Sequence, residues 1–299
     1  MASTALSSED LLKVAHEAAE AGRKVVLAAL NQPRNTVRKA GLDIVTAADK
    51  ESEAAVVAVI SAAFPGHAIL GEEGGVTGPV SSDYLWAIDP IDGTVNFASG
   101  LDSFCVSVGV LRHATPLAGV VVEFVGGPVW TTRIYSASRY GGAFLNGVRM
   151  SVSGVRDLAD AVVATEMTDN KDMWPHLSGL FKTLAQQARG VRMSGSAAAN
   201  LCRVASGTLD AYVHYNLKPW DVAAGVLIVE EAGGRVTTAD GVAYSVFDRS
   251  LLATNDALYD TMLAVSEPVT DALSEELLVD LSQWCVPAGY RVKAGAQLQ

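Results

Sequence analysis

Cysteine is scarce in this sequence, and its spacing suggests neither a cross-link nor a metal site. The three cysteines, Cys105, Cys202 and Cys285, are widely separated and form no C-x-x-C pair. An odd number of distant cysteines favours reduced thiols over a disulfide framework. We therefore expect a cytoplasmic protein whose cysteines remain free.

Basic residues are also in the minority. The 299 residues include 22 Lys and Arg against 33 Asp and Glu, which gives a net charge of −11. A nucleic-acid-binding protein presents a basic face, so this balance argues against a nucleic-acid partner. An anionic substrate must instead be attracted by local positive potential, from a bound metal ion or a helix N-terminus.

Long apolar runs are missing as well. No stretch is long enough to cross a bilayer, and the N-terminus lacks the basic and apolar segments of a signal peptide. We therefore expect no membrane partner. With 49% hydrophobic and 18% charged residues, the chain can bury a large core, and its length suits one large α/β domain or two smaller ones.

Several catalytic motifs are absent from the sequence. It contains no P-loop, no G-x-G-x-x-G, no G-x-S-x-G and no H-E-x-x-H. Nucleotide hydrolysis on a Walker fold and hydrolysis by a serine triad are therefore poorly supported.

The most informative stretch that is present reads W-A-I-D-P-I-D-G-T-V-N-F, residues 86–97. An apolar run over residues 84–88 predicts a buried strand, which Pro90 should end at Asp89. Asp89 and Asp92 then lie close together and repel each other unless a proton or a cation separates them. The alternative is that both acids are turn and cap residues.

Further acids occur in similar settings. Glu72 follows a short apolar pair, and Asp221 is expected at the N-cap of an apolar helix over residues 222–232. Asp49 lies three residues after Thr46, as in a capping box. Each acid has a structural explanation as a loop or cap residue. Together they offer only oxygen ligands, which match a hard cation such as Mg²⁺.

A small-residue turn introduces a different kind of candidate. Gly195, Ser196 and Ala197 precede a run of small residues that should start a helix, and Ser196 is flanked by no bulky side chain. A helix N-terminus exposes backbone N–H groups and binds anions readily. The alternative is an ordinary serine-capped helix in the core.

The remaining pattern indicates alternating helices and strands. Helices are expected over residues 8–30, 47–63, 173–188 and 257–265, and antiparallel strands over 104–111, 116–124 and 128–135. Thr94 is expected to cap a short helix after Gly93.

We expect a single domain over residues 1–266, with sub-halves 1–153 and 154–266, and then a tail over 267–299. The tail is predicted to contain an amphipathic helix that packs on its own domain or forms a dimer contact. The residues on its apolar face are Leu273, Leu277, Leu281 and Trp284.

Four segments in this order resemble the inositol monophosphatase family. They are G-E-E at residues 71–73, the segment 86–97, G-S-A-A at 195–198, and W-D-V-A-A-G at 220–225 followed by E-A-G-G at 231–234. The resemblance spans about residues 8–265. It implies a layered αβαβα sandwich, a homodimer, dependence on Mg²⁺ and inhibition by Li⁺.

The resemblance also implies roles for individual residues. Glu72, Asp89 and the Ile91 carbonyl would hold one Mg²⁺; Asp89, Asp92 and Asp221 would hold a second, and a third would bind weakly near Glu72.

The same resemblance implies how water and substrate are held. Thr94, paired with Asp49, would orient the attacking water, and Glu72 would also act in catalysis. The backbone of Gly93 and Thr94 would contact the phosphate. The substrate's hydroxyl side would be lined by Gly195, Ser196, Ala197 and His214.

We predict hydrolysis of a small phosphate monoester by metal-activated water, with a phosphorylated polyol, myo-inositol monophosphate, as the first candidate. Many family members that act on inositol carry an acid where this chain has His214. Histidinol phosphate and other sugar or nucleotide phosphates therefore remain open. A non-catalytic regulatory binding protein is the alternative from another class.

Overall fold

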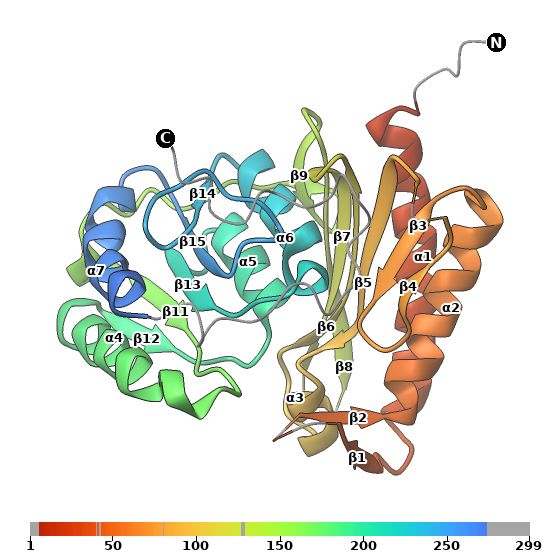
Figure 1. The fold of residues 1–299 in the computed structure, drawn as a ribbon, viewed down its shortest axis with the longest axis horizontal. Coiled ribbons are helices and arrows are strands. Elements are labelled where there is room, and N and C mark those ends of the chain that lie inside the picture. The colour runs from red at the N-terminus through yellow and green to blue at the C-terminus, as the bar shows by residue number, and fades with distance from the viewer. Residues whose placement is uncertain (1–5, 40, 42, 80, 127–128, 274–299) are drawn as a thin grey trace.

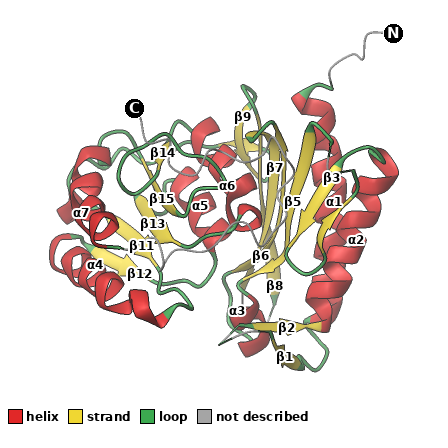
Figure 2. Cartoon of the chain, viewed as in Figure 1, coloured by secondary structure: helices red, strands yellow, loops and turns green. Residues whose placement is uncertain are grey.

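The computed structural model describes residues 6–39, 41, 43–79, 81–126 and 129–273. The tail residues Leu277, Leu281 and Trp284 lie outside these described residues, so the amphipathic tail helix stays a prediction. Within the described part of the chain, two large sheets alternate with pairs of helices (Figures 1 and 2).

An eight-stranded sheet forms the first half of the molecule. Six of its strands follow one another as an antiparallel meander, and β3 pairs with β5 in parallel. In spatial order its strands are β10 (Val148–Arg149), β9 (Gly142–Leu145), β8 (Trp130–Ser138), β7 (Thr115–Gly126), β6 (Phe104–Arg112), β5 (Tyr84–Asp92), β3 (Ala68–Gly71) and β4 (Gly75–Thr77).

Two long helices cover one face of this sheet. α1 (Ser8–Ala29) begins at Ser7, whose hydroxyl accepts a hydrogen bond from the Asp10 N–H, and α2 (Ala47–Ala63) follows the small hairpin of β1 (Thr36–Arg38) and β2 (Ile44–Thr46). Their apolar faces meet those of β5, β6 and β7 in one buried cluster.

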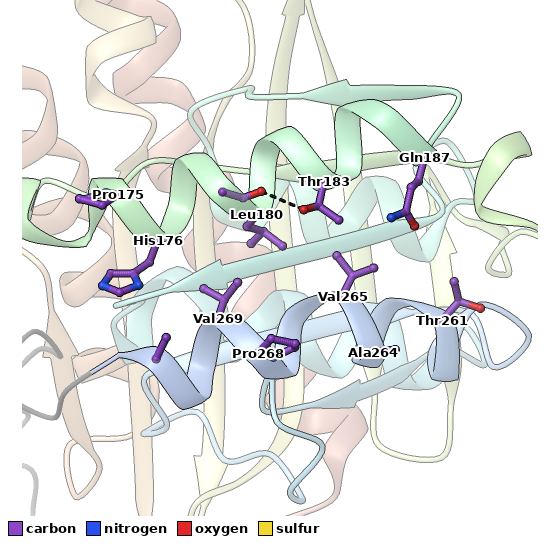
Figure 3. A pocket seen from close by; sticks show the side chains of 12 residues that line it. Pro175, His176, Leu180, Thr183, Gln187, Thr261, Ala264, Val265, Pro268 and Val269 are labelled. Atoms are coloured by element: carbon purple, nitrogen blue, oxygen red, sulfur yellow. Dashed lines mark hydrogen bonds between the residues drawn. The ribbon is translucent and has the colours of Figure 1, made fainter.

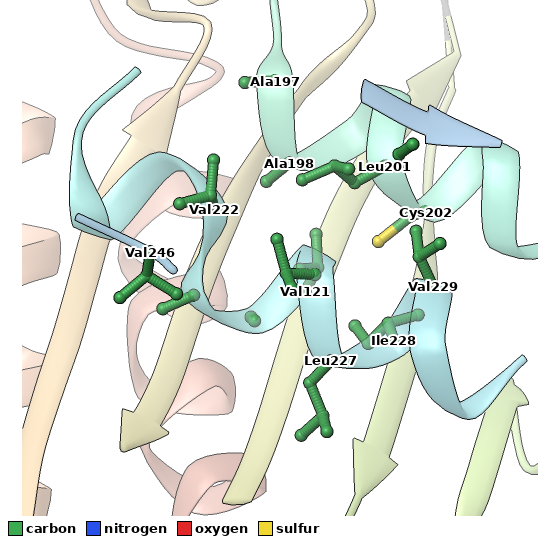
Figure 4. Close-up of a cluster of buried hydrophobic side chains, with 14 of the residues drawn as sticks. Val121, Ala197, Ala198, Leu201, Cys202, Val222, Leu227, Ile228, Val229 and Val246 are labelled. Carbon is green, nitrogen blue, oxygen red and sulfur yellow. The ribbon is translucent and has the colours of Figure 1, made fainter. Parts of the chain in front are cut away.

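The opposite face is covered by α5 (Ala197–Ala205) and α6 (Pro219–Glu231). Figure 4 shows Val121 of the sheet packed among Leu201 and Ile228 of these helices. The α6 helix lies unusually close to the sheet: a Cβ placed on Gly109 would come within 2.8 Å of the Ala224 backbone nitrogen. Glycine on β6 therefore sets the spacing between the sheet and α6.

A five-stranded sheet and an outer helix pair complete the layers. Its strands are, in spatial order, β12 (Gly190–Arg192), β11 (Val162–Thr165), β13 (Ala211–Tyr215), β15 (Ser250–Thr254) and β14 (Arg235–Thr237). The outer helices are α4 (Trp174–Gln187) and α7 (Tyr259–Ala272). The layers thus run helix, sheet, helix, sheet, helix, which confirms the predicted αβαβα sandwich.

A groove of about 680 Å³ runs between α4 and α7 (Figure 3). It is lined by apolar side chains such as Leu180, Val265 and Val269 and contains none of the predicted site residues. No helix in the described part of the chain could span a membrane.

Four predicted element boundaries were wrong, and two of them flank the turn after β5. β5 continues through Pro90 to Asp92, because a register irregularity between Asp89 and Asp92 removes the need for a ladder N–H at the proline. The short helix α3 (Thr94–Ser99) is capped by Gly93, in the left-handed conformation, and not by Thr94.

The α6 and α7 helices were also misplaced. Pro219 takes the first position of α6, which suits its fixed φ, so Asp221 lies in the first turn and Lys218 is the N-cap. The final helix continues past Val265, with Pro268 inside it, and ends at Ala272.

The close approach of α6 gives a test of the packing. Gly109→Ala should lower the free energy of unfolding by about 2 kcal/mol, because the added methyl has no space against α6. Gly179→Ala is the matched control: nothing lies within 4 Å of its Cβ in α4, so it should raise stability by roughly 0.5–1 kcal/mol. Urea unfolding measures both changes in the free energy of unfolding. Changes of the same sign in the two variants would contradict the packing argument.

Candidate active site

Glu72 and Asp89 are placed side by side by two parallel strands. Gly71, the last residue of β3, pairs with Ile88 of β5, and the Glu72 N–H donates to the Ile88 carbonyl at 3.2 Å. The next residue of β5 is Asp89. Because the strands are parallel, both acids emerge at the same edge of the sheet.

Asp221 reaches this edge from α6. Asp89 is paired in register with Ser107 of β6, and the Ser107 hydroxyl donates to the Trp220 carbonyl at 3.4 Å. The residue after Trp220 is Asp221. Ser107 thus links the segments that carry Asp89 and Asp221, which lie more than a hundred residues apart in the sequence.

The charges of the four carboxylates act on one another. Burial raises the pKa of Asp89 well above its usual value, and the negative charges of Glu72, Asp92 and Asp221 raise it further. Burial likewise raises the pKa of Asp221 to about 7, against the opposing effect of Lys218. The structure therefore brings together all four carboxylates that the sequence predicted to share a site.

Each of these carboxylates is engaged by a protein donor. Asp89 accepts from the Ile91 N–H at 3.1 Å, and Asp221 accepts from the Lys218 N–H at 2.8 Å. Glu72 accepts from the Lys39 ammonium at 3.0 Å. Consistent with these contacts, no three His, Cys, Asp or Glu side chains among the described residues already form a metal cage.

The donor set nevertheless fits Mg²⁺. It consists of carboxylate oxygens with the backbone carbonyl of Ile91 nearby, and Mg²⁺ prefers oxygen ligands. Asp89 is only 2% exposed and Asp92 only 8%. A divalent cation would neutralise the repulsion that raises their pKa values. This relief supplies a driving force for binding.

Thr94 connects the Ile91 carbonyl to Asp49. Its hydroxyl lies 3.0 Å from the Ile91 oxygen and 3.2 Å from an Asp49 carboxylate oxygen. The other Asp49 oxygen accepts from the N–H and the hydroxyl of Thr46, at 2.8 and 2.5 Å. The capping box that the sequence predicted thus also holds Asp49 against Thr94.

Glycines let the turn after β5 meet the turn before α5. Gly93 has φ of 91°, and a Cβ there would lie 3.1 Å from the Gly195 carbonyl. Asn96 fastens the two turns together, because its amide donates to the carbonyls of Ser103 at 2.7 Å and Ser194 at 2.6 Å. Gly195 therefore lies beside the predicted phosphate contact at Gly93.

The N-terminus of α5 holds the carboxylate of Asp92. The Ser196 hydroxyl and the Ala198 N–H each donate to Asp92 Oδ2 at 2.7 Å, and the Ala197 N–H donates to Asp92 Oδ1 at 3.3 Å. The anion site that the sequence predicted at this turn is thus filled by Asp92.

His214 lies on β13 and is 8% exposed. Burial lowers the pKa of His214 to about 4, so its imidazole is neutral at physiological pH. Its Nδ1 atom has no hydrogen-bond partner within the described chain.

Lys218, three residues before Asp221, lies beside it. Three other residues around the site could not be anticipated from the sequence. Lys39 bonds Glu72 and Glu73. Glu53 accepts from the Glu73 N–H at 2.9 Å. Glu166 accepts from the N–H groups of Ser194 and Gly195, at 2.7 and 3.0 Å. No local pattern marks them, since each contact joins distant segments.

Comparison with known proteins identifies the family. The model described as the inositol monophosphatase family matches residues 7–270. The chain belongs to the inositol monophosphatase family.

Individual relatives agree with this assignment. The protein named Phosphatase IMPL1, chloroplastic, of Arabidopsis thaliana is 48% identical over 290 residues, which cover 96% of this chain and 78% of the relative. Inositol monophosphatase 2 of Solanum lycopersicum is 36% identical over 264 residues, which cover 85% of this chain and 97% of the relative.

The fold agrees as well. The structure of inositol monophosphatase from Anabaena (Nostoc) sp. PCC 7120 matches with a TM-score of 0.77 at 35% identity, covering 92% of this chain and 99% of that one. The resemblance and the fold class inferred from the motifs are confirmed. Family membership also bears out the expectation that the chain is a phosphoric monoester hydrolase.

Repulsion within the site predicts an effect on stability. Asp89→Asn should raise the unfolding temperature of the protein in EDTA, because it removes a buried charge from the cluster. It should also abolish stabilisation by Mg²⁺. Thermal unfolding with and without Mg²⁺ measures both. Asp102→Asn, at an exposed position, is the control; an Asp89→Asn protein less stable in EDTA than wild type would contradict the argument.

Proposed function

We propose that this protein hydrolyses small phosphate monoesters with Mg²⁺ held by Glu72, Asp89, Asp92, Asp221 and the Ile91 carbonyl. Two ions per subunit, and a weaker third near Glu72, would suit this number of ligands. The proposal is carried by one observation, the convergence of four mutually repelling carboxylates at one sheet edge.

The chemistry requires strong charge stabilisation. Hydrolysis of phosphate monoesters is among the slowest uncatalysed reactions in water. Bound Mg²⁺ would supply an activated water and neutralise the developing charge on phosphate and leaving oxygens. The Cys105 thiol lies 3.6 Å from Asp92, but burial raises its pKa well above the usual value, so it is a poor nucleophile and direct attack by water is the simplest route.

Thr94 is suited to hold the attacking water. Its single hydroxyl proton is directed to Asp49 or to the Ile91 carbonyl, so its oxygen lone pairs are left to accept a hydrogen bond from water. Asp49 is fully buried and fixes the direction of that hydroxyl. We assign the pair to orienting the water, with Glu72 beside it, and the backbone N–H groups of Gly93 and Thr94 to the phosphate.

The environment of His214 favours a polyol phosphate. A neutral imidazole offers one donor and one acceptor, which suit a hydroxyl group. It supplies no negative charge for the ammonium group of histidinol phosphate. We therefore propose myo-inositol monophosphate as substrate. Inhibition by Li⁺, a homodimer and cytoplasmic localisation remain predictions, and the Arabidopsis relative is itself named chloroplastic.

The substrate assignment is tested with a panel of phosphate esters. At saturating Mg²⁺, kcat/KM should be highest for myo-inositol 1-phosphate and at least tenfold lower for histidinol phosphate, and EDTA should abolish turnover of both. A preference for histidinol phosphate would overturn the inositol assignment. Turnover that persists in EDTA would overturn the metal-dependent mechanism.

The role of Thr94 is tested by removing its hydroxyl. Thr94→Val keeps the shape of the side chain and should lower kcat by about 10²- to 10⁴-fold, because the water loses the hydrogen-bond acceptor that orients it. KM for the substrate should change little. Thr94→Ser should retain most activity, and Thr131→Val, on the exposed side of β8, is the control. A Thr94→Val protein with normal kcat would remove Thr94 from the mechanism.

A further inference from the structure

Asp92 is fixed by contacts that cross from one half of the molecule to the other. It ends β5 of the eight-stranded sheet, and its donors begin α5, more than a hundred residues later. Ser196 is 1% exposed and Asp92 is 8% exposed, so solvent competes little for these hydrogen bonds. A charge-assisted hydrogen bond in such a setting is strong and directional.

The two oxygens of Asp92 are held unequally. Oδ2 accepts from the Ser196 hydroxyl and the Ala198 N–H, both at 2.7 Å, and the Cys105 thiol lies 3.6 Å away. Oδ1 has only the Ala197 N–H, at 3.3 Å. A carboxylate has about four lone-pair directions, two on each oxygen. Oδ2 is therefore saturated by the protein, and Oδ1 retains capacity for another ligand.

We propose that Ser196 is a positioning residue that holds Oδ2 of Asp92 and leaves Oδ1 available to bind the cation. This inference rests on the proposed function in one respect, that Asp92 is a ligand of Mg²⁺. It assigns Ser196 a different role from the substrate contact predicted from sequence. The Ser196 hydroxyl gives its only proton to Asp92 and accepts from the Ala199 N–H at 3.3 Å, so no proton remains for a substrate hydroxyl.

The test removes the donor while keeping the start of the helix. Ser196 is the N-cap of α5, and glycine replaces serine at an N-cap with little loss of stability. In Ser196→Gly, the half-saturating Mg²⁺ concentration should rise about tenfold, the usual effect of losing a partner of a metal ligand. It is measured without substrate, from the Mg²⁺-dependent rise of the unfolding temperature and by titration calorimetry.

A second readout separates positioning from substrate contact. p-Nitrophenyl phosphate has no sugar-like hydroxyl groups, so a residue that only contacts such groups would not affect its hydrolysis. If Ser196 positions Asp92, hydrolysis of p-nitrophenyl phosphate by Ser196→Gly should need about tenfold more Mg²⁺. Near-normal kcat should return at saturating Mg²⁺.

Two further variants complete the design. Ser196→Thr keeps the hydroxyl and should return the half-saturating Mg²⁺ concentration toward the wild-type value. Ser7→Gly is a matched control, because Ser7 caps α1 and its hydroxyl donates to Asp10 at 2.7 Å, just as Ser196 donates to Asp92. It lies on another helix end and should leave Mg²⁺ binding unchanged.

The outcomes distinguish the inference from the proposed function. If Mg²⁺ does not stabilise the wild-type protein, the metal site and the role of Ser196 both fail. If Mg²⁺ stabilises wild type and Ser196→Gly with equal half-saturation, only the role of Ser196 fails. A raised KM for inositol phosphate with unchanged Mg²⁺ binding would assign Ser196 to the substrate and overturn the inference. A Ser196→Thr protein that binds Mg²⁺ no better than Ser196→Gly would also overturn it.

Discussion

Repulsion among buried carboxylates is the constraint on which the rest of the site depends. The parallel pairing of β3 with β5 and the packing of α6 bring Glu72, Asp89 and Asp221 close together. Isolated charges in such surroundings cost much free energy and are normally neutralised by a proton or a partner. The fold maintains this unfavourable arrangement with the close fit of its layers, including the glycine that lets α6 approach β6. A small, highly charged cation would neutralise this repulsion.

The cluster is stabilised without a metal by local donors. Lys39 lies against Glu72, and burial, which alone would lower the pKa of Lys39, is outweighed by Glu72 and Glu73, which raise it. Burial would likewise lower the pKa of Lys218, but nearby carboxylates, Asp221 first among them, raise it. Each ammonium group therefore offsets part of the negative charge of the carboxylate beside it. In the mechanism proposed above, Mg²⁺ at Glu72 would therefore compete with the Lys39 ammonium for the same carboxylate.

Much of the site could be predicted from sequence because its ligands lie at the ends of locally recognisable elements. The apolar run before Asp89 and the capping pattern of Thr46 and Asp49 are short-range signals, and both correspond to the structure. Boundaries were less predictable. Pro90 is tolerated inside β5 because the strand bulges there, and Pro219 begins α6 earlier than an N-cap at Asp221 would allow. The conformational preference of a residue can be read from the sequence. Where a strand or helix ends also depends on how it packs against its neighbours, which the sequence does not show.

The contacts that hold the ligands in place could not be predicted, since they depend on how distant segments fold together. Glu53 on α2 holds the turn that carries Glu72, Glu166 holds the turn before α5, and α5 in turn holds Asp92. In each case a buried carboxylate accepts backbone N–H groups of a turn, an arrangement that fixes the turn and satisfies the charge at once. Glu53 and Glu166 thus fix turns of the framework, whereas Asp92 accepts comparable donors and also lies among the carboxylates of the site.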